Sequence, residues 1–285
     1  MRRIDLHTHS TASDGTASPR ELVRLAKDAG LAAIALTDHD TVGGLPEALA
    51  AGEEYGIEVI PGCELSCESD VGWMHIVGLW APVEPKALAG AFEYVINGRE
   101  VRNRLIVEKL NELGVDVTYE ELRAMAEGVL GRPHFARALM DHGVVRTVQQ
   151  AFDEYLGEDG KAYVPKAKLT PEKAIAALKA DGALAVLAHP FMLRLDAAGM
   201  REKVGELKDY GLDGIEVFYT EHSAEQTDAF ARLAGDLGLL MSGGSDFHGT
   251  VKPNTRLGEG KGDLAIPYSL LEEMKDYRRE RGLWV

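Results

Sequence analysis

The spacing of apolar and polar positions changes repeatedly along the chain. Short runs rich in Val, Ile, Leu and Ala alternate with longer runs in which apolar residues recur at helical spacing. Strands that alternate with helices are typical of parallel βα units rather than of a β-sandwich or a helix bundle. The pattern therefore predicts an α/β fold. We expect strands at residues 3–7, 32–37, 57–61, 74–80, 183–188, 214–219 and 239–242.

Helix-start signals support this prediction. Between the first two strands, Ser18 supplies an N-cap, Pro19 a proline in the first turn and Glu21 a capping-box glutamate. Gly30 then ends the helical spacing, which completes a βαβ unit. Thr170 opens a helix in the same way, directly before the fifth strand.

The regular spacing fails between residues 80 and 183, where about a hundred residues replace a connection that usually needs roughly thirty. Most of this segment has helical character, with Thr118 and Glu121 as another capping box. We therefore predict a barrel domain formed by residues 1–98 and 167–285, with a small helical cap, residues 99–166, inserted into it.

The composition is that of a globular protein with enough apolar residues for a full core. The chain has 285 residues, of which 45% are hydrophobic, and a net charge of −15, which argues against a nucleic-acid duplex as partner. No run approaches the roughly 18 apolar residues of a membrane span. Neither a membrane nor a signal segment is therefore expected, and we expect a cytoplasmic location. Cys63 and Cys67 are too few for a disulfide framework.

Histidines and acidic residues gather at the predicted strand ends. His7 and His9 stand two apart on one strand, so both imidazoles can point to the same face. His75 lies at the beginning of its run instead, so either that strand is misplaced or its side chain enters from the strand's beginning. The remaining members of the set are Asp38, His39, Glu64, His189, Asp246 and His248.

In a parallel β/α barrel the carboxyl ends of all strands face one mouth, so residues separated in sequence become a cluster in space. Six of the nine histidines belong to the set. Imidazoles and carboxylates without a thiolate favour zinc, manganese or iron over calcium. The sequence therefore predicts a metal centre at the mouth of a barrel.

These motifs resemble those of the PHP (polymerase and histidinol phosphatase) family of metallo-phosphoesterases over essentially the whole chain. The resemblance implies a distorted seven-stranded barrel with a site for three divalent ions, manganese first, with zinc or iron as alternatives. The motifs are His7-Thr8-His9, Asp14, Thr37-Asp38-His39, Gly62-Cys63-Glu64, His75, Ala188-His189-Pro190 and Ser245-Asp246-Phe247-His248.

The resemblance also implies a ligand set for each ion. The first ion takes His7, His9, Glu64 and Asp246. The second shares Glu64 and adds His75 and His189. The third takes Asp14, His39 and His248. Other members have a histidine where this chain has Asp14, and a carboxylate there suits manganese or magnesium.

Three carboxylates and three divalent ions leave a formal charge of about +3, which suits a phosphate monoester. We expect catalysis to depend on Glu64, Asp246 and His189, because they hold the ions that activate the attacking water. The group that protonates the leaving alcohol stays open between a histidine and a water molecule.

Within the family, the inserted segment with Gly131-Arg132-Pro133-His134 resembles that of 3′,5′-nucleoside bisphosphate phosphatases and of related 5′-to-3′ exonucleases on short RNA. The resemblance implies a small phosphorylated nucleotide as partner, most directly loss of its 3′-phosphate (pAp to AMP), and short single-stranded RNA as a further one. Arg132 offers a fork for a phosphate, and a helix N-terminus beside His134 suits the same anion. The alternative is that both residues only cap that helix.

Other residues are weaker candidates for substrate contacts. Lys161, Tyr163 and Lys166 could bind an anion or a base, or be a solvated segment. His222 could face the mouth or lie on the surface. Rival functions are a histidinol or sugar-phosphate phosphatase and a non-catalytic PHP interaction module, and the complete ligand set argues against the module.

Overall fold

The computed structural model describes residues 2–126, 130–165 and 167–285. The chain divides into two compact units, unit 1 with Met1–Phe92 and Leu169–Val285, and unit 2 with Glu93–Lys168. The insertion predicted from the sequence, residues 99–166, lies within the range of unit 2. Lys166, one of the predicted contacts, lies outside the described residues.

Unit 1 is built on one eight-stranded sheet with the order β7-β6-β5-β4-β3-β2-β1-β8. The sheet nearly closes into a barrel, because the backbone N–H of Leu6 donates to the carbonyl of Gly243 at 3.0 Å and so joins the β1 side to β7. Every residue of β2 and β5 is buried, as expected for strands covered on both faces. The strands are β1 (Arg3–Asp5), β2 (Ala33–Leu36), β3 (Glu58–Cys67), β4 (Met74–Leu79), β5 (Leu184–Leu187), β6 (Gly214–Tyr219), β7 (Leu240–Gly244) and β8 (Ile266–Pro267).

Each of the seven predicted strands overlaps an observed one, but the sheet differs from the prediction in two respects. It has an eighth strand, β8, which pairs antiparallel with β1 and contains only two residues, too few to give a sequence pattern. The prediction of a wholly parallel sheet is also wrong, because β4 runs antiparallel to both β3 and β5. The beginning of β4 therefore lies beside the end of β5, where the N–H of Ala188 donates to the carbonyl of His75 at 3.1 Å.

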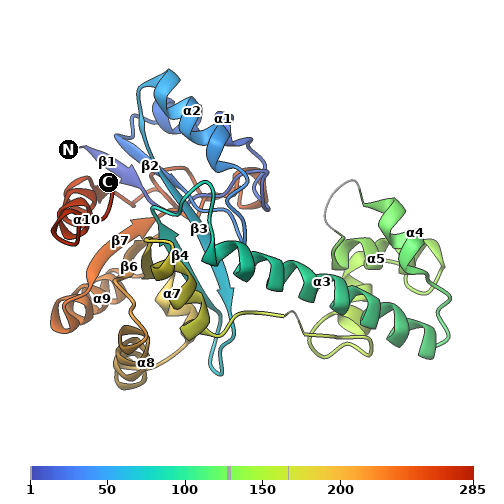
Figure 1. Ribbon diagram of the computed structural model, residues 1–285. Helices are drawn as coiled ribbons and strands as arrows, with labels where there is room; N and C mark the ends of the chain where they lie inside the picture. The colour runs from blue at the N-terminus through green and yellow to red at the C-terminus, as the bar shows by residue number, and fades with distance from the viewer. Residues whose placement is uncertain (1, 127–129, 166) are drawn as a thin grey trace. The chain divides into compact units, whose positions relative to one another are not determined.

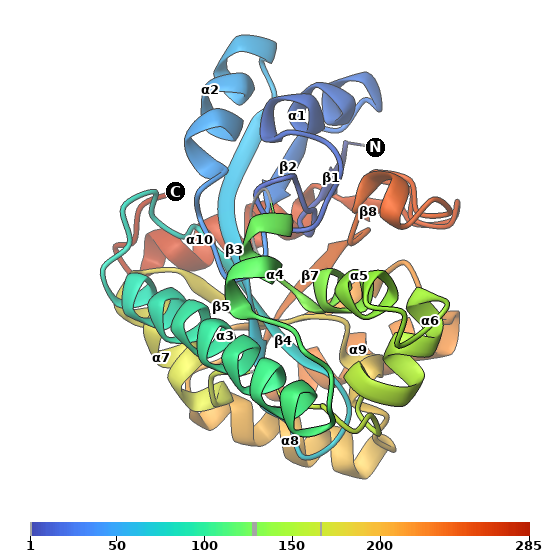
Figure 2. The same cartoon turned by 90° about the vertical axis from the view of Figure 1, so that its right-hand side faces the viewer.

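The α-helices that lie wholly in unit 1 are arranged around the strands (Figure 2). Helices α8 and α9 lie side by side (Figures 1 and 2), and Arg201 of α8 pairs with Asp236 of α9 at 2.8 Å. The predicted N-caps are confirmed, since the side chains of Ser18 and Thr170 accept hydrogen bonds from the first turns of their helices. The helices are α1 (Pro19–Asp28), α2 (Leu45–Tyr55), α7 (Pro171–Ala180), α8 (Ala197–Asp209), α9 (Ala224–Leu237) and α10 (Ser269–Glu280), with short 3-10 turns η2 (Pro190–Leu193) and η3 (Gly249–Val251).

Unit 2 is helical and has an apolar core of its own, in which Ile106, Leu122, Phe135 and Leu139 are buried together. Helix α3 (Ala87–Glu112) begins in unit 1 and continues into unit 2. No helix in the described ranges is long and apolar enough to cross a membrane. The other helices are α4 (Tyr119–Met125), α5 (Arg132–Asp141), α6 (Val148–Ala151) and the π-turn η1 (Phe152–Leu156).

One glycine lets β7 approach the end of β1. A Cβ atom on Gly244 would lie 2.1 Å from the Cβ of His7 and 2.6 Å from its backbone nitrogen. We expect Gly244→Ala to lower the free energy of unfolding by about 1–3 kcal/mol, because the backbone at Gly244 and the backbone at His7 are both held in place and cannot move apart freely. The measurement is urea unfolding. The control is Gly235→Ala on α9, where a Cβ meets nothing within 4 Å, and it should stabilise the chain by about 0.5–1 kcal/mol. Equal stabilities for the two variants would contradict the close approach.

Candidate metal centre

The loops after β1 and β7 are joined by one buried carboxylate. Asp5, at the end of β1, accepts hydrogen bonds from the backbone N–H of Ser245 at 2.9 Å and from that of Gly258 at 2.8 Å. The Asp246 N–H then donates to the carbonyl of His7 at 2.9 Å. These bonds hold the His7 segment against the Asp246 segment, although 240 positions separate Asp5 from Ser245.

Glu64, in the middle of β3, is the centre of the cluster, and its side chain is only 1% exposed. Five imidazole nitrogens lie within 3.3 Å of its two carboxylate oxygens. The neighbours of Oε2 are His7 Nε2 at 3.3 Å, His9 Nε2 at 3.3 Å and His39 Nδ1 at 3.0 Å. The neighbours of Oε1 are His75 Nδ1 at 2.9 Å and His189 Nε2 at 3.1 Å.

Two further carboxylates extend the cluster away from Glu64. Asp246 Oδ1 lies 3.3 Å from His9 Nε2 and 3.3 Å from His248 Nδ1. Asp14 Oδ1 lies 3.3 Å from His248 Nε2, and the other oxygen of Asp14 lies 3.9 Å from His39 Nε2. The Asp14 side chain is 56% exposed, so this end of the cluster is open to solvent.

The nine predicted ligands are thus brought together, eight of them in three groups whose possible ligand atoms lie within 4.8 Å of one another. His189, the ninth, lies against Glu64. His39 belongs to two of the groups, because its Nδ1 faces Glu64 and its Nε2 faces Asp14. The family resemblance implied only the group that contains Asp14. The groups are His9, Asp14, His39 and His248; His7, His9 and Asp246; and His39, Glu64 and His75.

Buried polar atoms that lack a hydrogen-bond partner indicate whether these residues can hold metal ions. Such atoms are rare in folded proteins unless an ion or water satisfies them. Nitrogen and carboxylate oxygen atoms are suitable donors for zinc, manganese or iron, so the donor set fits divalent ions. The buried atoms of the cluster that lack a hydrogen-bond partner are His7 Nε2, His9 Nδ1, His9 Nε2, His39 Nδ1, Glu64 Oε2 and His189 Nδ1.

The charges of the cluster shift its pKa values strongly in the metal-free chain. Burial opposes ionisation of Glu64, but the charges of His39, His7 and His75 outweigh it and hold the pKa of Glu64 well below its usual value. Burial also opposes the charged form of His9, yet the neighbouring carboxylates of Asp246 and Glu64, each 3.3 Å from its Nε2, raise its pKa to about 9. For His39, burial dominates and lowers the pKa to about 3.

A second layer of residues, which was not predicted from the sequence, orients the ligands. Glu216 of β6 is buried, lies 3.1 Å from Nδ1 of His7 and accepts the backbone N–H of His189 at 2.6 Å. A carboxylate on Nδ1 fixes the tautomer and presents Nε2 to an ion. The signal available in the sequence was an acidic residue in the middle of an apolar strand, Gly214–Tyr219.

Two predicted ligands have left-handed backbones, with φ of 30° at His189 and 56° at Asp246. This conformation costs energy for a residue with a Cβ atom and persists only where surrounding contacts enforce it. The bond from His189 to Glu216 and the bond from Asp246 to the His7 carbonyl provide such contacts. The strain therefore lies where the side chains turn into the cluster.

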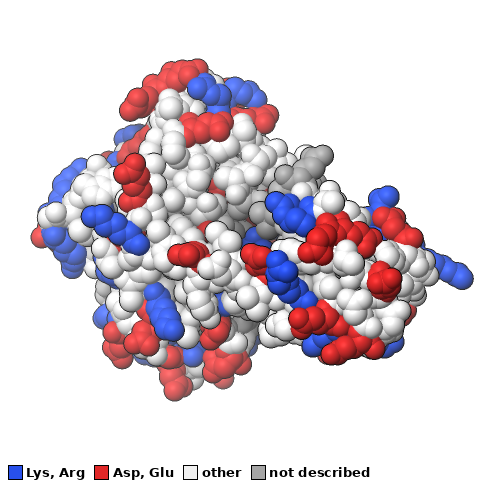
Figure 3. Space-filling view, turned by 45° about the vertical axis from the view of Figure 1, so that its right-hand side comes forward, with Lys and Arg blue, Asp and Glu red and all other residues white. Residues whose placement is uncertain are grey.

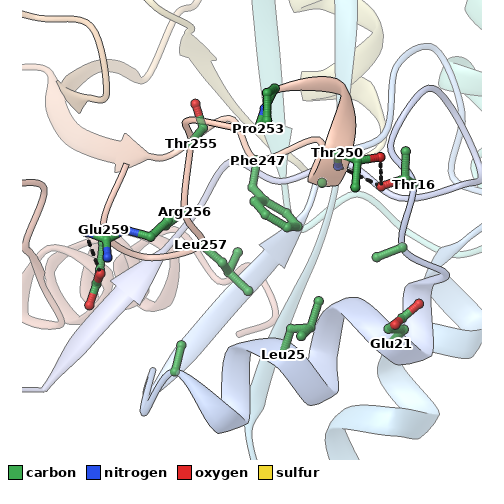
Figure 4. Close-up of a pocket in the computed structure, with 13 residues that line it drawn as sticks. Thr16, Glu21, Leu25, Phe247, Thr250, Pro253, Thr255, Arg256, Leu257 and Glu259 are labelled. Atoms are coloured by element: carbon green, nitrogen blue, oxygen red, sulfur yellow. Dashed lines mark hydrogen bonds and ion pairs between the residues drawn. The ribbon is translucent and has the colours of Figure 1, made fainter. Parts of the chain in front are cut away.

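Phe247 anchors the loop between the ligands Asp246 and His248. Its ring lines a cavity of about 830 Å³ between α1 and the 249–259 segment, near Leu25 and Leu257 (Figure 4). Phe247 packs against the apolar cluster that contains Leu22 and Leu257, while Asp246 and His248 face the metal-ligand cluster.

The predicted substrate residues fall into both units. In unit 1, the His222 ring packs 5.3 Å from Tyr219 and 4.8 Å from Phe230, and its Nδ1 lies 2.9 Å from the carbonyl of Val217. His222 is therefore half-buried rather than a surface histidine, and burial lowers its pKa. It lies beside Tyr219, not among the proposed metal ligands.

In unit 2, His134 caps α5, since its Nδ1 accepts the backbone N–H of Gly131 at 3.1 Å. Arg132 donates to the carbonyl of Leu156 at 3.1 Å. Lys161 lies over the Tyr155 ring, with its Nζ 5.3 Å from the ring centroid. The carbonyl of Tyr163 accepts a hydrogen bond from Lys109 at 2.5 Å, so this contact does not use the Tyr163 ring.

A buried arginine in unit 2 was also missed. Arg102 of α3 is only 8% exposed, donates to Asn103 at 3.3 Å, and has an Nε atom without a partner. Burial, together with the positive charges of Arg132 and Arg99, lowers its pKa to about 10. No carboxylate among the described residues pairs with any of these three arginines. The signal in the sequence was the basic run Arg99-Glu100-Val101-Arg102-Asn103-Arg104.

Known proteins are similar to this chain over most of its length. The family model described as PHP domain matches residues 5–229. A 5′-3′ exoribonuclease of Haemophilus influenzae is 38% identical over 87% of this chain and 90% of its own length. A 3′,5′-nucleoside bisphosphate phosphatase of Chromobacterium violaceum is 36% identical over 87% of this chain and 88% of its own length. A solved structure from Bifidobacterium adolescentis, described as a metal-dependent phosphoesterase, covers 96% of both chains at 32% identity and a TM-score of 0.76.

The raised pKa of His9 predicts that metal binding releases protons. At neutral pH a histidine with a pKa of about 9 is protonated, and it must lose that proton to bind an ion. We expect the affinity for Mn²⁺ to increase as the pH rises from neutral toward about 9, with protons released on binding. Calorimetry in two buffers of different ionisation enthalpy measures this release. His9→Gln should reduce it, and His142→Gln in unit 2 should not. An affinity independent of pH would contradict the prediction.

Proposed function

The chain belongs to the PHP domain family, and within this family of phosphoesterases we propose that it removes the 3′-phosphate from 3′,5′-nucleoside bisphosphates. Hydrolysis of a phosphoric ester agrees with the names of its relatives and of its structural neighbour. The choice of a nucleotide with two phosphates rests on unit 2.

The metal centre of unit 1 carries the hydrolytic chemistry. We assign three divalent ions to it, manganese first, ahead of zinc and iron, held by the nine predicted ligands. Ions bound there supply positive charge to the phosphoryl oxygens and activate the attacking water. Glu64, Asp246 and His189 hold them in place, while Glu216 accepts the Nδ1 proton of His7 and keeps Nε2 free for an ion.

The observation that carries the substrate assignment is the arginine site of unit 2, formed by Arg99, Arg102 and Arg132. Arg102 is buried beside two like charges, and no carboxylate among the described residues pairs with it. Its burial therefore costs free energy, which a bound anion would offset. Guanidinium groups match a phosphate group in geometry as well as in charge. The arginine site therefore favours a substrate that has a second phosphate besides the one hydrolysed.

Short RNA is the second candidate substrate, because a relative of 38% identity is named a 5′-3′ exoribonuclease. A 5′-phosphate on RNA would satisfy the arginine site as a nucleotide phosphate does. A histidinol or sugar phosphate has one phosphate and leaves the arginine site empty.

Turnover by the manganese-loaded protein ranks these substrates directly. We expect kcat/KM to be highest for a 3′,5′-bisphosphate and to fall for the matching nucleoside monophosphate, since the second phosphate orients the scissile one. A higher kcat/KM for histidinol phosphate or a simple sugar phosphate than for every nucleotide would refute the assignment. A short RNA turned over better than the bisphosphate would make the exonuclease activity the principal one.

Arg132→Ala tests the arginine site. We expect KM for the bisphosphate to rise by about ten- to hundredfold, as for loss of a hydrogen bond between charged groups, with the metal content unchanged. The matched control is Arg137→Ala on the same helix, whose guanidinium pairs with Asp141 at 3.1 Å on the surface. Equal KM values for the two variants would contradict the role of Arg132.

A further inference from the structure

The two oxygens of Asp246 have different surroundings. Oδ1 faces the imidazoles of His9 and His248, each at 3.3 Å. Oδ2 accepts a hydrogen bond from the hydroxyl of Tyr219 at 2.9 Å and another from the ammonium of Lys252 at 2.6 Å. Oδ1 is thus directed to the metal centre, and Oδ2 is held by two donors from the chain.

Tyr219 alone is suited to orient Asp246. It is buried, extends from the end of β6, and packs against His189 with 5.5 Å between ring centroids. Lys252 has a different character, because it follows the short turn η3 and its side chain is 39% exposed. The orientation of Asp246 therefore does not explain why a lysine is present.

The charge of Lys252 is the feature that needs an explanation. An ammonium group beside divalent ions repels them, so the lysine opposes metal binding unless it has another role. Its amine has three N–H donors, and the structure records one acceptor for them, Asp246, among the described residues. Two donors remain for a ligand that arrives from solvent at the edge of the metal centre.

We propose that Lys252 binds the phosphoryl group of the substrate at the metal centre. A phosphoryl group has more negative charge than the single carboxylate of Asp246, so it attracts the ammonium group of Lys252 more strongly. N–H donors directed at the phosphoryl oxygens also stabilise the negative charge during hydrolysis. Lys252 is then a substrate contact in unit 1, separate from the arginine site of unit 2. The inference rests on the proposed phosphoesterase function and names a further residue of that same site.

Binding of inorganic phosphate separates this role from metal binding. The measurement is calorimetric titration of the manganese-loaded and the metal-free protein with phosphate, and only the manganese-dependent binding is counted. We expect Lys252→Met to weaken this binding by about tenfold or more, while elemental analysis shows the parent's manganese content. Lys252→Arg should keep most of the affinity, because it retains charge and donors.

Lys261→Met is the matched control, since Lys261 is an exposed lysine of unit 1 that pairs with Glu221 at 2.7 Å. It should bind phosphate like the parent. The proposal is overturned if Lys252→Met also binds phosphate like the parent, or if it loses manganese, which would make Lys252 part of the metal centre's support. A parent protein without any manganese-dependent phosphate binding would instead contradict the proposed function itself.

Discussion

The carboxylate of Glu64 is the group on which the rest of the site depends. An isolated carboxylate in this buried position would be very costly, and five imidazoles alone would leave several of their nitrogens without partners. Divalent ions held by the carboxylate and the imidazoles would satisfy both requirements. The backbone fixes the position of Glu64, because its N–H donates to the backbone carbonyl of Asp38 at 3.0 Å and its carbonyl accepts the backbone N–H of Asp40 at 2.9 Å.

The net charge of the chain is negative, whereas the sites proposed for phosphate contain positively charged groups. The chain has a net charge of −15, and acidic and basic side chains are intermingled on the face drawn in Figure 3. The places proposed for phosphate are local exceptions: the metal centre with Lys252, and the arginine site of unit 2. A small anion can be bound by such localised charge although the protein as a whole repels it.

The sequence predicted much of the site because most of the nine predicted ligands follow apolar runs, and the ends of such runs can be located in the sequence. His75, at the beginning of β4, and Glu64, in the middle of β3, are the exceptions. It could not predict the direction of β4, since the apolar pattern of a buried strand is the same whichever way it runs. That direction explains why His75 stands at the beginning of its strand. Glu216, Tyr219 and Lys252 act through contacts between distant segments, so no local spacing revealed them. Arg102 was missed for the same reason, because its burial depends on the packing of unit 2.

The manganese content of the parent and of Glu64→Gln tests the central claim most directly. Glutamine preserves the shape of the side chain and removes the charge that two of the proposed ions share. Elemental analysis after loading should find about three ions in the parent and about one in the variant, the one held by Asp14, His39 and His248. A variant that retains the parent's manganese content, or a parent that binds one ion or none, would contradict the account.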